Sequence, residues 1–290
     1  MLPNKTILDD KMSITDREFR QLRDFIHAHT GIALSEHKRA LVCSRLAKRL
    51  RHHSLSCYAD YYSLLIGSDP QEHELLAMIN AITTNKTDFF REPHHFEFLA
   101  TEFFLAHRRN PQRPKPLRIW SAGSSSGEEA YSIAMTALET LFPRTDQDVL
   151  ILASDIDTEM LARAENGVYS MEQAAQIPED LLHRYFLKGE GEYDGQVIAK
   201  PVLKSLVRFR RLNLMEEPWP MQEPFDIIFC RNVIIYFDKP TQQRLFRRFA
   251  GNLKKDGFLM LGHSEGLHGY ADSFRTVGHS IYQYKGTIRS

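Results

Sequence analysis

Cysteine is scarce in this 290-residue sequence, and no long apolar run occurs in it. The three cysteines, Cys43, Cys57 and Cys230, form no Cys-x-x-Cys pair, so they predict reduced thiols rather than disulfides or structural zinc. No apolar stretch approaches the roughly 18 residues that a membrane span needs, and the first residues lack the apolar core of a signal peptide. We therefore expect a cytoplasmic protein that does not insert into a membrane.

Net charge is also missing, because 37 Lys and Arg residues balance 37 Asp and Glu residues. This balance argues against a globally basic nucleic-acid-binding protein, and we expect no nucleic-acid partner. A chain of this length buries roughly three quarters of its unfolded surface, so neither disulfides nor a metal is needed for stability. No metal cofactor is expected either, because His94, His95 and His263 have no recognisable ligand spacing.

The charges balance globally but not locally. Between His37 and His53 the sequence has six Lys or Arg residues and no acid. Apolar residues recur there at intervals of three and four, which predicts a helix with one buried side. The opposite side would carry Arg45, Lys48 and Arg49. Two interpretations remain open: a solvated helix face, or a docking surface for an acidic partner.

Residues 1–92 have the pattern of a helical domain. A capping box at Thr15 to Glu18 begins a periodic apolar stretch that stops at Gly31. Another helix is expected from Pro93 to about Asn110. A stiff connection then follows at Pro111, Pro114 and Pro116.

The pattern changes in the remaining part of the chain, where apolar runs alternate with amphipathic helical stretches. The runs lie at residues 117–120, 149–153, 225–230 and 257–261. This alternation is typical of an α/β fold with a doubly wound, mostly parallel sheet. Residues 280–284 alternate in polarity and predict an antiparallel edge strand that closes the sheet. Between residues 170 and 212 the rhythm breaks, and we expect a small inserted β-rich subdomain.

A turn of small residues, Ser121 to Gly127, follows the first run. Its Gly-x-x-x-Gly spacing and its lack of Lys-Ser/Thr match neither the dinucleotide fingerprint nor the P-loop. Glu128 and Glu129 would lie in the first turn of the next helix, where they repel phosphate. A cofactor that carries an ammonium and a sulfonium, S-adenosyl-L-methionine, fits these charges better than NAD or ATP. The alternative is that both glutamates only complement the helix dipole.

Polar residues also follow two other apolar runs. Asp155 comes 28 residues after the second glycine of the turn, somewhat beyond the roughly 20 residues typical of a ribose-binding acid, and is the candidate for that role. Asp157 fits a helix cap better. Arg231 and Asn232 follow the run at 225–230, at the end of the strand where binding residues concentrate.

Five segments of the sequence carry a family resemblance. They are His37–Arg39, Thr83–Glu92, Trp120–Ala122 together with Gly127–Ser132, Ala153–Asp157 and Phe229–Phe237. Together they resemble the chemotaxis receptor glutamate O-methyltransferases, the CheR family. The resemblance implies a class I, Rossmann-like S-adenosylmethionine-dependent methyltransferase fold with an N-terminal all-helical domain. Receptor docking would belong to residues 1–92 and methyl transfer to residues 93–290, with a β-subdomain at 170–212.

The resemblance also implies the site residues. Contacts to S-adenosylmethionine are expected from Asn85, Thr87, Arg91, Glu129, Asp155, Asn213, Leu214, Arg231 and Asn232. Among them, Glu129 would hold the methionyl end and Asp155 the ribose. Arg91 and Tyr236 would position the substrate carboxylate. The family usually has Ala, Thr and Pro where this sequence has Gly123, Ser126 and Ala130, and we expect the turn to survive these small replacements.

The implied reaction moves a methyl group from S-adenosylmethionine to the side-chain carboxylate of receptor glutamates, with S-adenosyl-L-homocysteine as the product. A glutamate is already ionised at pH 7, so the attack on the methyl group needs no general base. The enzyme has to align oxygen, carbon and sulfur and to exclude water. This chemistry predicts a guanidinium near the carboxylate and no Ser-His-Asp constellation.

Methyl-accepting chemotaxis receptors are the implied partners. Their methylation region is a coiled coil rich in Glu and Gln, which favours docking on the basic helix through Arg45, Lys48, Arg49 and Arg51. In some family members the β-subdomain also binds a peptide tether at the receptor C-terminus by strand addition. The loop Lys188–Gly191 looks like that version, although a purely structural insertion would have the same pattern.

Two other function classes compete with methyl transfer. One is a non-catalytic module that binds S-adenosylmethionine or its product as a regulatory ligand. The other is a nicotinamide dehydrogenase on the same fold, which Glu128, Glu129 and the glycine spacing disfavour.

Overall fold

The computed structural model describes residues 14–67, 72–110, 116–141, 149–267 and 270–286. The amino-terminal residues and two prolines of the expected stiff connection, Pro111 and Pro114, lie outside these ranges. The chain divides into a helical unit, residues 1–84 with 236–238, and a sheet unit that holds the rest. The division after Thr84 assigns residues 85–92 to the sheet unit, whereas the boundary expected from the sequence followed residue 92. No helix in the described ranges is long and apolar enough to cross a membrane.

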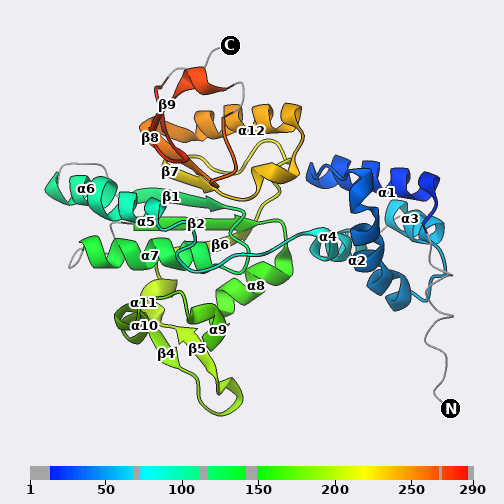
Figure 1. Ribbon diagram of the computed structural model, residues 1–290, viewed down its shortest axis with the longest axis horizontal. Coiled ribbons are helices and arrows are strands. Elements are labelled where there is room, and N and C mark those ends of the chain that lie inside the picture. The colour runs from blue at the N-terminus through cyan, green and yellow to red at the C-terminus, as the bar shows by residue number, and fades with distance from the viewer. Residues whose placement is uncertain (1–13, 68–71, 111–115, 142–148, 268–269, 287–290) are drawn as a thin grey trace. The chain divides into compact units, whose positions relative to one another are not determined.

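Four α-helices make up the described part of the helical unit. They are α1 (Asp16–Thr30), α2 (Arg39–His52), α3 (Tyr58–Ile66) and α4 (His73–Ile82), with a 3₁₀ turn at Glu36–Lys38 (Figure 1). The predicted capping box is present, because the Thr15 amide donates to Glu18 Oε2 at 2.8 Å and the Glu18 amide donates to Thr15 Oγ1 at 3.3 Å. Helix α1 ends at Gly31 as predicted, in a left-handed conformation with φ 72°. The periodic apolar residues form the core: Phe19, Leu22, Ile26, Val42, Leu46 and Leu50.

Helix α2 directs two of its four expected docking residues toward α4. Arg45 donates to the Thr83 carbonyl at 2.7 Å, and Arg49 forms an ion pair with a carboxylate of α4. Lys48 and Arg51 are exposed. The expectation that the basic residues share one solvent-facing side is therefore wrong. The helix period places Arg45 and Arg49 at the border of the buried apolar stripe, where they find acceptors on the neighbouring helix.

A buried carboxylate joins three helices of this unit. Glu74 Oε1 accepts hydrogen bonds from the Tyr61 hydroxyl at 2.7 Å and from Arg49 Nε at 3.0 Å, and Glu74 Oε2 lies 2.6 Å from His53 Nε2. Burial by itself raises the pKa of Glu74, but the hydrogen bonds from Arg49, Tyr61 and His53 outweigh burial and hold the pKa below its ordinary value. The negative charge of Glu74 is therefore stabilised in the folded unit.

Residues Tyr236–Asp238 belong to the helical unit although they follow a strand of the sheet unit in sequence. Phe237 forms an antiparallel bridge with Ile32, and the Tyr236 carbonyl accepts a hydrogen bond from the Ala33 amide at 2.8 Å. The Nζ atom of Lys38 lies 5.8 Å from the centre of the Tyr236 ring. These contacts fix Tyr236 beside the start of the basic helix.

The main sheet of the sheet unit has the strand order β6-β2-β1-β7-β8-β10-β9. Its strands are β1 (Leu117–Ala122), β2 (Val149–Asp155), β6 (Val207–Arg211), β7 (Phe225–Cys230), β8 (Leu253–Leu261), β9 (Phe274–Gly278) and β10 (Ile281–Tyr284). The first five in spatial order run parallel, which confirms the predicted doubly wound sheet. Strand β10 is antiparallel as expected, but it is not the edge, because β9 pairs with its outer side.

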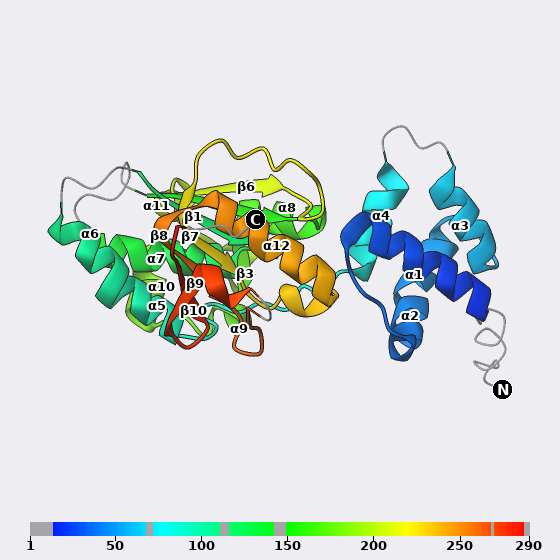
Figure 2. The same cartoon turned by 90° about the horizontal axis from the view of Figure 1, so that it is seen from above.

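Helices cover both faces of this sheet. One face is covered by α7 (Glu128–Leu141) and by the helical stretch expected after Pro93, which consists of α5 (His94–Phe98), a π-helical part (Leu99–Phe104) and α6 (Leu105–Arg109). Ile119 of β1 is buried in the same core as α7. Its neighbour Trp120 points to the opposite face and packs against Phe249 of α12 (Lys239–Asn252), with ring centres 5.5 Å apart. Figure 2 shows the ribbons of α5, α7 and α12 from above. Strand alternation thus separates the two cores.

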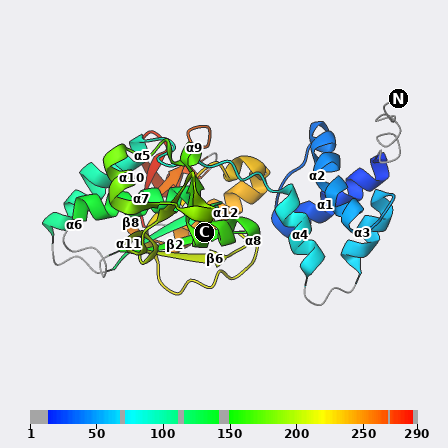
Figure 3. The same ribbon diagram turned by 90° about the horizontal axis from the view of Figure 1, so that it is seen from below.

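The inserted subdomain is shorter and more helical than expected. It contains a three-stranded antiparallel sheet in the order β3-β5-β4. Its elements are β3 (Val168–Ser170), α9 (Met171–Ala174), α10 (Glu179–Tyr185), β4 (Phe186–Lys188), β5 (Gln196–Ala199) and α11 (Pro201–Lys204). It follows α8 (Thr158–Asn166), which lies beside β6 at the outer edge of the main sheet (Figure 3).

Strand β6 is a correction to the expected insertion at 170–212. It pairs in parallel with β2, so residues 207–211 belong to the main sheet. Val207 and Phe209 are buried whereas Arg208 and Arg210 are exposed. An edge strand with one solvent-exposed face alternates in polarity, so this strand lacks the continuous apolar run that marks the other parallel strands.

The Glu74 network generates a stability prediction. We expect Glu74→Ala to lower the free energy of unfolding by about 2–4 kcal/mol, because it removes the acceptor that Arg49 and Tyr61 share in a partly buried site. Urea denaturation of the full chain, followed by far-UV circular dichroism, measures the loss. Glu36→Ala is the control, since this carboxylate pairs with Arg39 at the surface and its loss should cost less than about 1 kcal/mol.

The same network predicts the sign of a pH effect. Because the folded pKa of Glu74 lies below its value in the unfolded chain, the stabilisation is complete above the ordinary pKa of 4.5 and is lost as the pH falls through the lower folded value. The stability difference between the wild type and Glu74→Gln should shrink as the pH is lowered from 7 toward 3. An undiminished difference at the low end would contradict this account.

Candidate cofactor site

The turn between β1 and α7 requires its glycines. Gly123 has φ 86° and Gly127 has φ 95°, which lie in a backbone region where any residue with a Cβ atom is strained. A Cβ atom on Gly123 would lie 2.4 Å from Val233 Cγ2, and one on Gly127 would lie 2.8 Å from Ala164 Cβ. Glycine is therefore required at both positions, because of the positive φ and because Val233 and Ala164 pack directly against the backbone there. The hydroxyl of Ser124 is buried there and has no hydrogen-bond partner among the described residues.

Asp155 ends β2 and braces this turn. Its Oδ2 accepts a hydrogen bond from the Ser125 amide at 2.8 Å, and its Oδ1 accepts one from the Asp157 amide at 2.9 Å. Burial raises the pKa of Asp155 and outweighs these two hydrogen bonds, which act in the other direction. Each carboxylate oxygen has further lone pairs, so the brace leaves Asp155 able to accept from a hydroxyl donor.

Asn85 also contacts the turn between β1 and α7. Its carbonyl accepts a hydrogen bond from Ser125 Oγ at 2.9 Å, and its Nδ2 donates to Asp157 Oδ2 at 2.6 Å. Asp157 also caps α8 by accepting from the Glu159 amide at 3.0 Å and the Met160 amide at 3.1 Å, as predicted. Asn85, the turn and Asp155 thus come together although they lie far apart in sequence.

The two glutamates at the start of α7 have different partners. Glu129 Oε1 accepts from Ser121 Oγ at 2.7 Å, and Glu129 Oε2 pairs with Arg231 at 2.9 Å. Glu128 instead accepts from Ser126 Oγ at 2.7 Å and from Nε2 of Gln173, in the inserted subdomain, at 3.2 Å. Burial raises the pKa of Glu128. Glu129 therefore belongs to the site at the strand ends, whereas Glu128 joins the turn to the insertion.

Arg231 is a buried cation that connects three segments. Besides Glu129, its guanidinium lies 3.4 Å from Glu92 Oε2 and donates to the Arg91 carbonyl. It also lies over the Phe96 ring at 5.7 Å. The contact between Arg231 and Glu92 was not predicted. Its one sign in the sequence is that Glu92 directly follows Arg91 at the end of the motif Thr83–Glu92. Arg91 itself donates to the Lys86 carbonyl at 3.0 Å, which folds residues 86–91 back on themselves.

Glu265 is a second residue that the sequence did not indicate. Its Oε2 accepts from the Gly262 amide at 2.6 Å and from the Asn232 amide at 2.9 Å, and its Oε1 accepts from the Ile235 amide at 3.1 Å. Asn232 has φ 59°, and Glu265 holds that strained turn in place. Burial nevertheless raises the pKa of Glu265. A lone glutamate in a loop has no sequence pattern by which this role could be predicted.

The remaining predicted residues are less closely tied to this group. Asn213 and Leu214 are buried after β6, next to the Leu212 amide that donates to the Asp155 carbonyl at 3.0 Å. Thr87 is half-buried. Tyr236 belongs to the helical unit.

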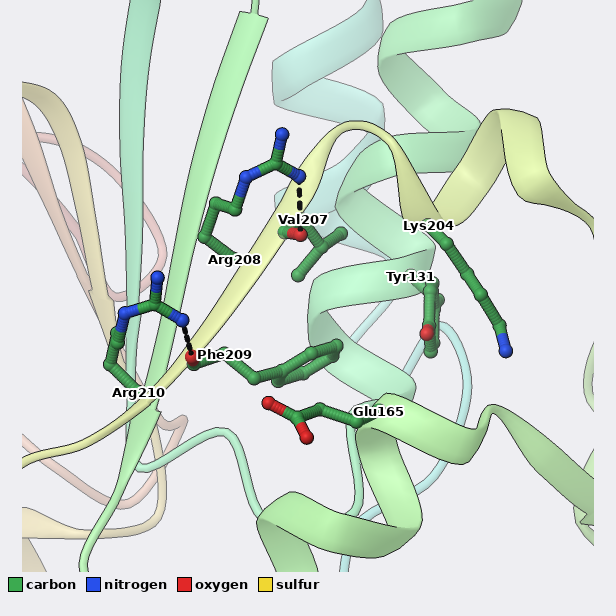
Figure 4. Close-up of a pocket in the computed structure, with 7 residues that line it drawn as sticks. All are labelled: Tyr131, Glu165, Lys204, Val207, Arg208, Phe209 and Arg210. Atoms are coloured by element: carbon green, nitrogen blue, oxygen red, sulfur yellow. Dashed lines mark hydrogen bonds between the residues drawn. The ribbon is translucent and has the colours of Figure 1, made fainter.

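A hollow beside β6 contains none of the predicted cofactor residues. It is lined by Tyr131, Glu165, Lys204, Val207, Arg208, Phe209 and Arg210 (Figure 4). Arg208 and Arg210 donate to the carbonyls of Val207 at 3.1 Å and Phe209 at 2.7 Å, and their side chains lie across the β6 ribbon from Glu165. Arg208, Arg210 and Glu165 therefore do not converge on one binding point in this hollow.

The site geometry fits S-adenosylmethionine. Glycine backbone, buried acids and the unpartnered Ser124 hydroxyl meet at the carboxyl ends of β1 and β2, where open α/β sheets bind their ligands. The family models match in the same places: the CheR methyltransferase SAM binding domain covers residues 85–283, and the CheR methyltransferase all-alpha domain covers residues 17–83. This chain belongs to the CheR methyltransferase family.

Curated relatives agree along nearly the whole chain. The chain is 45% identical to chemotaxis protein methyltransferase 2 of Pseudomonas aeruginosa over 280 residues, which covers 97% of each protein. It is 42% identical to the chemotaxis protein methyltransferase of Escherichia coli over 275 residues, covering 95% of this chain and 93% of that protein. The predicted CheR family, fold class, S-adenosylmethionine-dependent activity and reaction on receptor glutamates are confirmed.

Gly127 generates a prediction for the CheR turn. Gly127→Ala should lower the free energy of unfolding by about 2–3 kcal/mol and weaken S-adenosylhomocysteine binding, because positive φ and contact with Ala164 act together. Thermal unfolding and isothermal titration calorimetry measure the two effects. Gly191→Ala is the matched control: it has φ 63° with nothing within 4 Å, and it should lose only the strain of about 1 kcal/mol. Equal losses in the two variants would mean that Ala164 does not constrain the turn.

Proposed function

We propose that the carboxyl ends of β1, β2 and β7 hold S-adenosylmethionine through nine residues. These are Asn85, Thr87, Arg91, Glu129, Asp155, Asn213, Leu214, Arg231 and Asn232. The observation that carries the proposal is the pairing of buried Glu129 and Arg231 at 2.9 Å beside the glycine turn. A carboxylate and a guanidinium side by side match the ammonium and the carboxylate of an amino acid, which is the methionyl end of the cofactor.

Asp155 takes the ribose in this proposal. It ends the strand next to β1, and its carboxylate is already oriented by two backbone amides. A buried acceptor that is held in one position loses little conformational freedom when a hydroxyl donates to it. Asn213 and Leu214 follow the strand on the other side of Asp155 and complete the adenosine contacts.

The reaction proceeds by in-line displacement without a general base. When bound, S-adenosylmethionine supplies a methyl group activated by the sulfonium. We propose that Arg91 and Tyr236 orient the receptor carboxylate. Its oxygen would take the methyl group as the bond to sulfur breaks, which would leave a glutamate methyl ester and S-adenosylhomocysteine without any proton transfer. The enzyme contributes alignment and exclusion of water.

We propose that the receptor docks on the solvent-facing side of α2, and that this docking takes place in the cytoplasm. Lys48 and Arg51 are exposed there, and Leu41 adds an apolar contact with 38% of its surface exposed. Arg45 and Arg49 support the docking face from behind by joining α2 to α4. A basic face of this kind complements the acidic coiled coil of a receptor methylation region.

The inserted subdomain is proposed to bind a receptor tether by strand addition at β4. This strand is an edge of the small sheet and pairs only with β5 among the described strands. Leu187 at its centre is 52% exposed, which offers an apolar contact to an added strand. The loop after β4 is tight, since a Cβ atom on Gly189 would lie 2.0 Å from the Tyr193 carbonyl oxygen. Backbone pairing supplies affinity in such complexes, and side-chain pockets supply selectivity.

The proposed methionyl contact is tested by Glu129→Gln. The variant should raise the KM for S-adenosylmethionine by about 10- to 100-fold, because a hydrogen bond to a charged group is lost, and should leave the KM for the receptor unchanged. The assay follows radiolabelled methyl groups into receptor-enriched membranes and their release by mild base. Glu139→Gln, on the same helix, is the control and should behave like the wild type. Unchanged cofactor affinity in Glu129→Gln would remove this residue from the site.

The docking face is tested by charge reversal. A double variant, Lys48→Glu with Arg51→Glu, should raise the KM for the receptor at least about tenfold and leave S-adenosylhomocysteine affinity unchanged, because like charges then face each other. The effect should fade as salt is added. Arg17→Glu with Arg20→Glu, on exposed positions of α1, is the matched control. If both double variants weaken the receptor equally, α2 is not the specific docking face.

A further inference from the structure

Three potential metal ligands meet at the start of α5. Glu92, His94 and His95 each offer one ligand atom, and these atoms lie within 4.8 Å of one another. Zinc–nitrogen and zinc–oxygen bonds are about 2.0–2.2 Å long, so ligand atoms around one ion lie about 3.4 Å apart in tetrahedral geometry. His95 Nδ1 and Glu92 Oε2 are 3.7 Å apart. A small inward movement of the three side chains would therefore reach coordinating distance.

His95 gives an independent indication of a binding site at this place. Its side chain is completely buried, yet neither ring nitrogen has a hydrogen-bond partner among the described residues. Glu92 Oε2, which faces it, makes no hydrogen bond among the described residues, and its ion-pair partner Arg231 lies 3.4 Å away. A buried ring nitrogen without a partner is unfavourable, so a ligand that binds it would be stabilising.

His94 is oriented as metal-binding histidines are. Its Nε2 lies 3.1 Å from the His279 carbonyl oxygen, which can only accept, so neutral His94 carries its proton on Nε2. Nδ1 is then the nitrogen with the free lone pair. A backbone carbonyl that fixes the tautomer in this way is the usual support of a histidine ligand. His263 lies close by, with its Nδ1 3.2 Å from Glu92 Oε1.

The charges around the cluster allow a cation. Arg231 lies 3.4 Å from Glu92 and 2.9 Å from Glu129. Two carboxylates against one guanidinium leave a net charge of −1 in a buried region, and the histidines are neutral ligands. A divalent ion would change this sum to +1, so the surplus carboxylate compensates half of the ion's charge, and the ion would share Glu92 with Arg231.

We propose that Glu92, His94 and His95 form a binding site for a divalent transition-metal ion of the zinc class. Two imidazoles and one carboxylate are a donor set that suits such ions better than Mg²⁺ or Ca²⁺. The proposed metal site adjoins the cofactor site, because Glu92 pairs with Arg231, but the methyl-transfer chemistry itself needs no metal. It adds a ligand that the reaction of the family does not imply.

The test uses tag-free full-length protein. Co²⁺, whose visible absorption reports ligation by nitrogen, is titrated first, and Zn²⁺ is then used to displace it. The wild type should bind one ion with a ligand-field spectrum. His94→Ala and Glu92→Gln should each weaken binding at least about tenfold. His95→Phe removes both ring nitrogens from the buried position and should weaken binding in the same way.

The control is His183→Ala on α10, an exposed histidine beside Glu179 that should leave the titration unchanged. Far-UV circular dichroism of each variant shows whether it is folded. His94→Ala is expected to fold normally, because His94 is only half-buried, so it keeps the proposal testable if His95→Phe is unfolded. Identical titrations in the wild type, His94→Ala and His95→Phe would overturn the proposal. So would crystals soaked in Zn²⁺ that show a water molecule and no anomalous peak between Glu92 and His95.

Discussion

The buried guanidinium of Arg231 is the interaction on which the arrangement of the site depends. Moving a charge out of water costs several kcal/mol unless partners compensate it. Arg231 follows β7, and its partners are Glu129 on α7, Glu92 and the Arg91 carbonyl. Because the charge cannot remain buried without them, the segment 85–92 and the first turn of α7 are held at the end of β7.

Carboxylates brace the other turns of the site. Asp155 accepts backbone amides at the end of β2, and Glu265 accepts three in the loops after β7 and β8. Each carboxylate satisfies amides that a tight turn would otherwise leave unpaired in a buried place. The zero net charge of the chain therefore conceals acids gathered at the strand ends and bases gathered on α2. A buried ion pair also stabilises the helical unit, where Glu74 pairs with Arg49 of α2.

Sequence reasoning succeeded where the signal is local. The capping box at Thr15 and the cap at Asp157 involve residues within three positions of each other. It failed where a neighbour in space decides the outcome. Strand β6 alternates because it is an edge, and β9 displaces β10 from the other edge. Arg45 and Arg49 turn from solvent because α4 presents acceptors to them.

The sequence by itself determined the family, the kind of cofactor and the order of most elements, because these depend on contiguous motifs and on the periods of helix and strand. Only the tertiary structure decided which side chains meet. The partners of Arg231 lie 102 and 139 positions before it in sequence, and no pattern along the chain links them. The same holds for Glu265 and for the histidines near Glu92. Contacts of this kind arise when parallel strands bring their carboxyl ends to one edge, which is a property of the sheet and not of any segment.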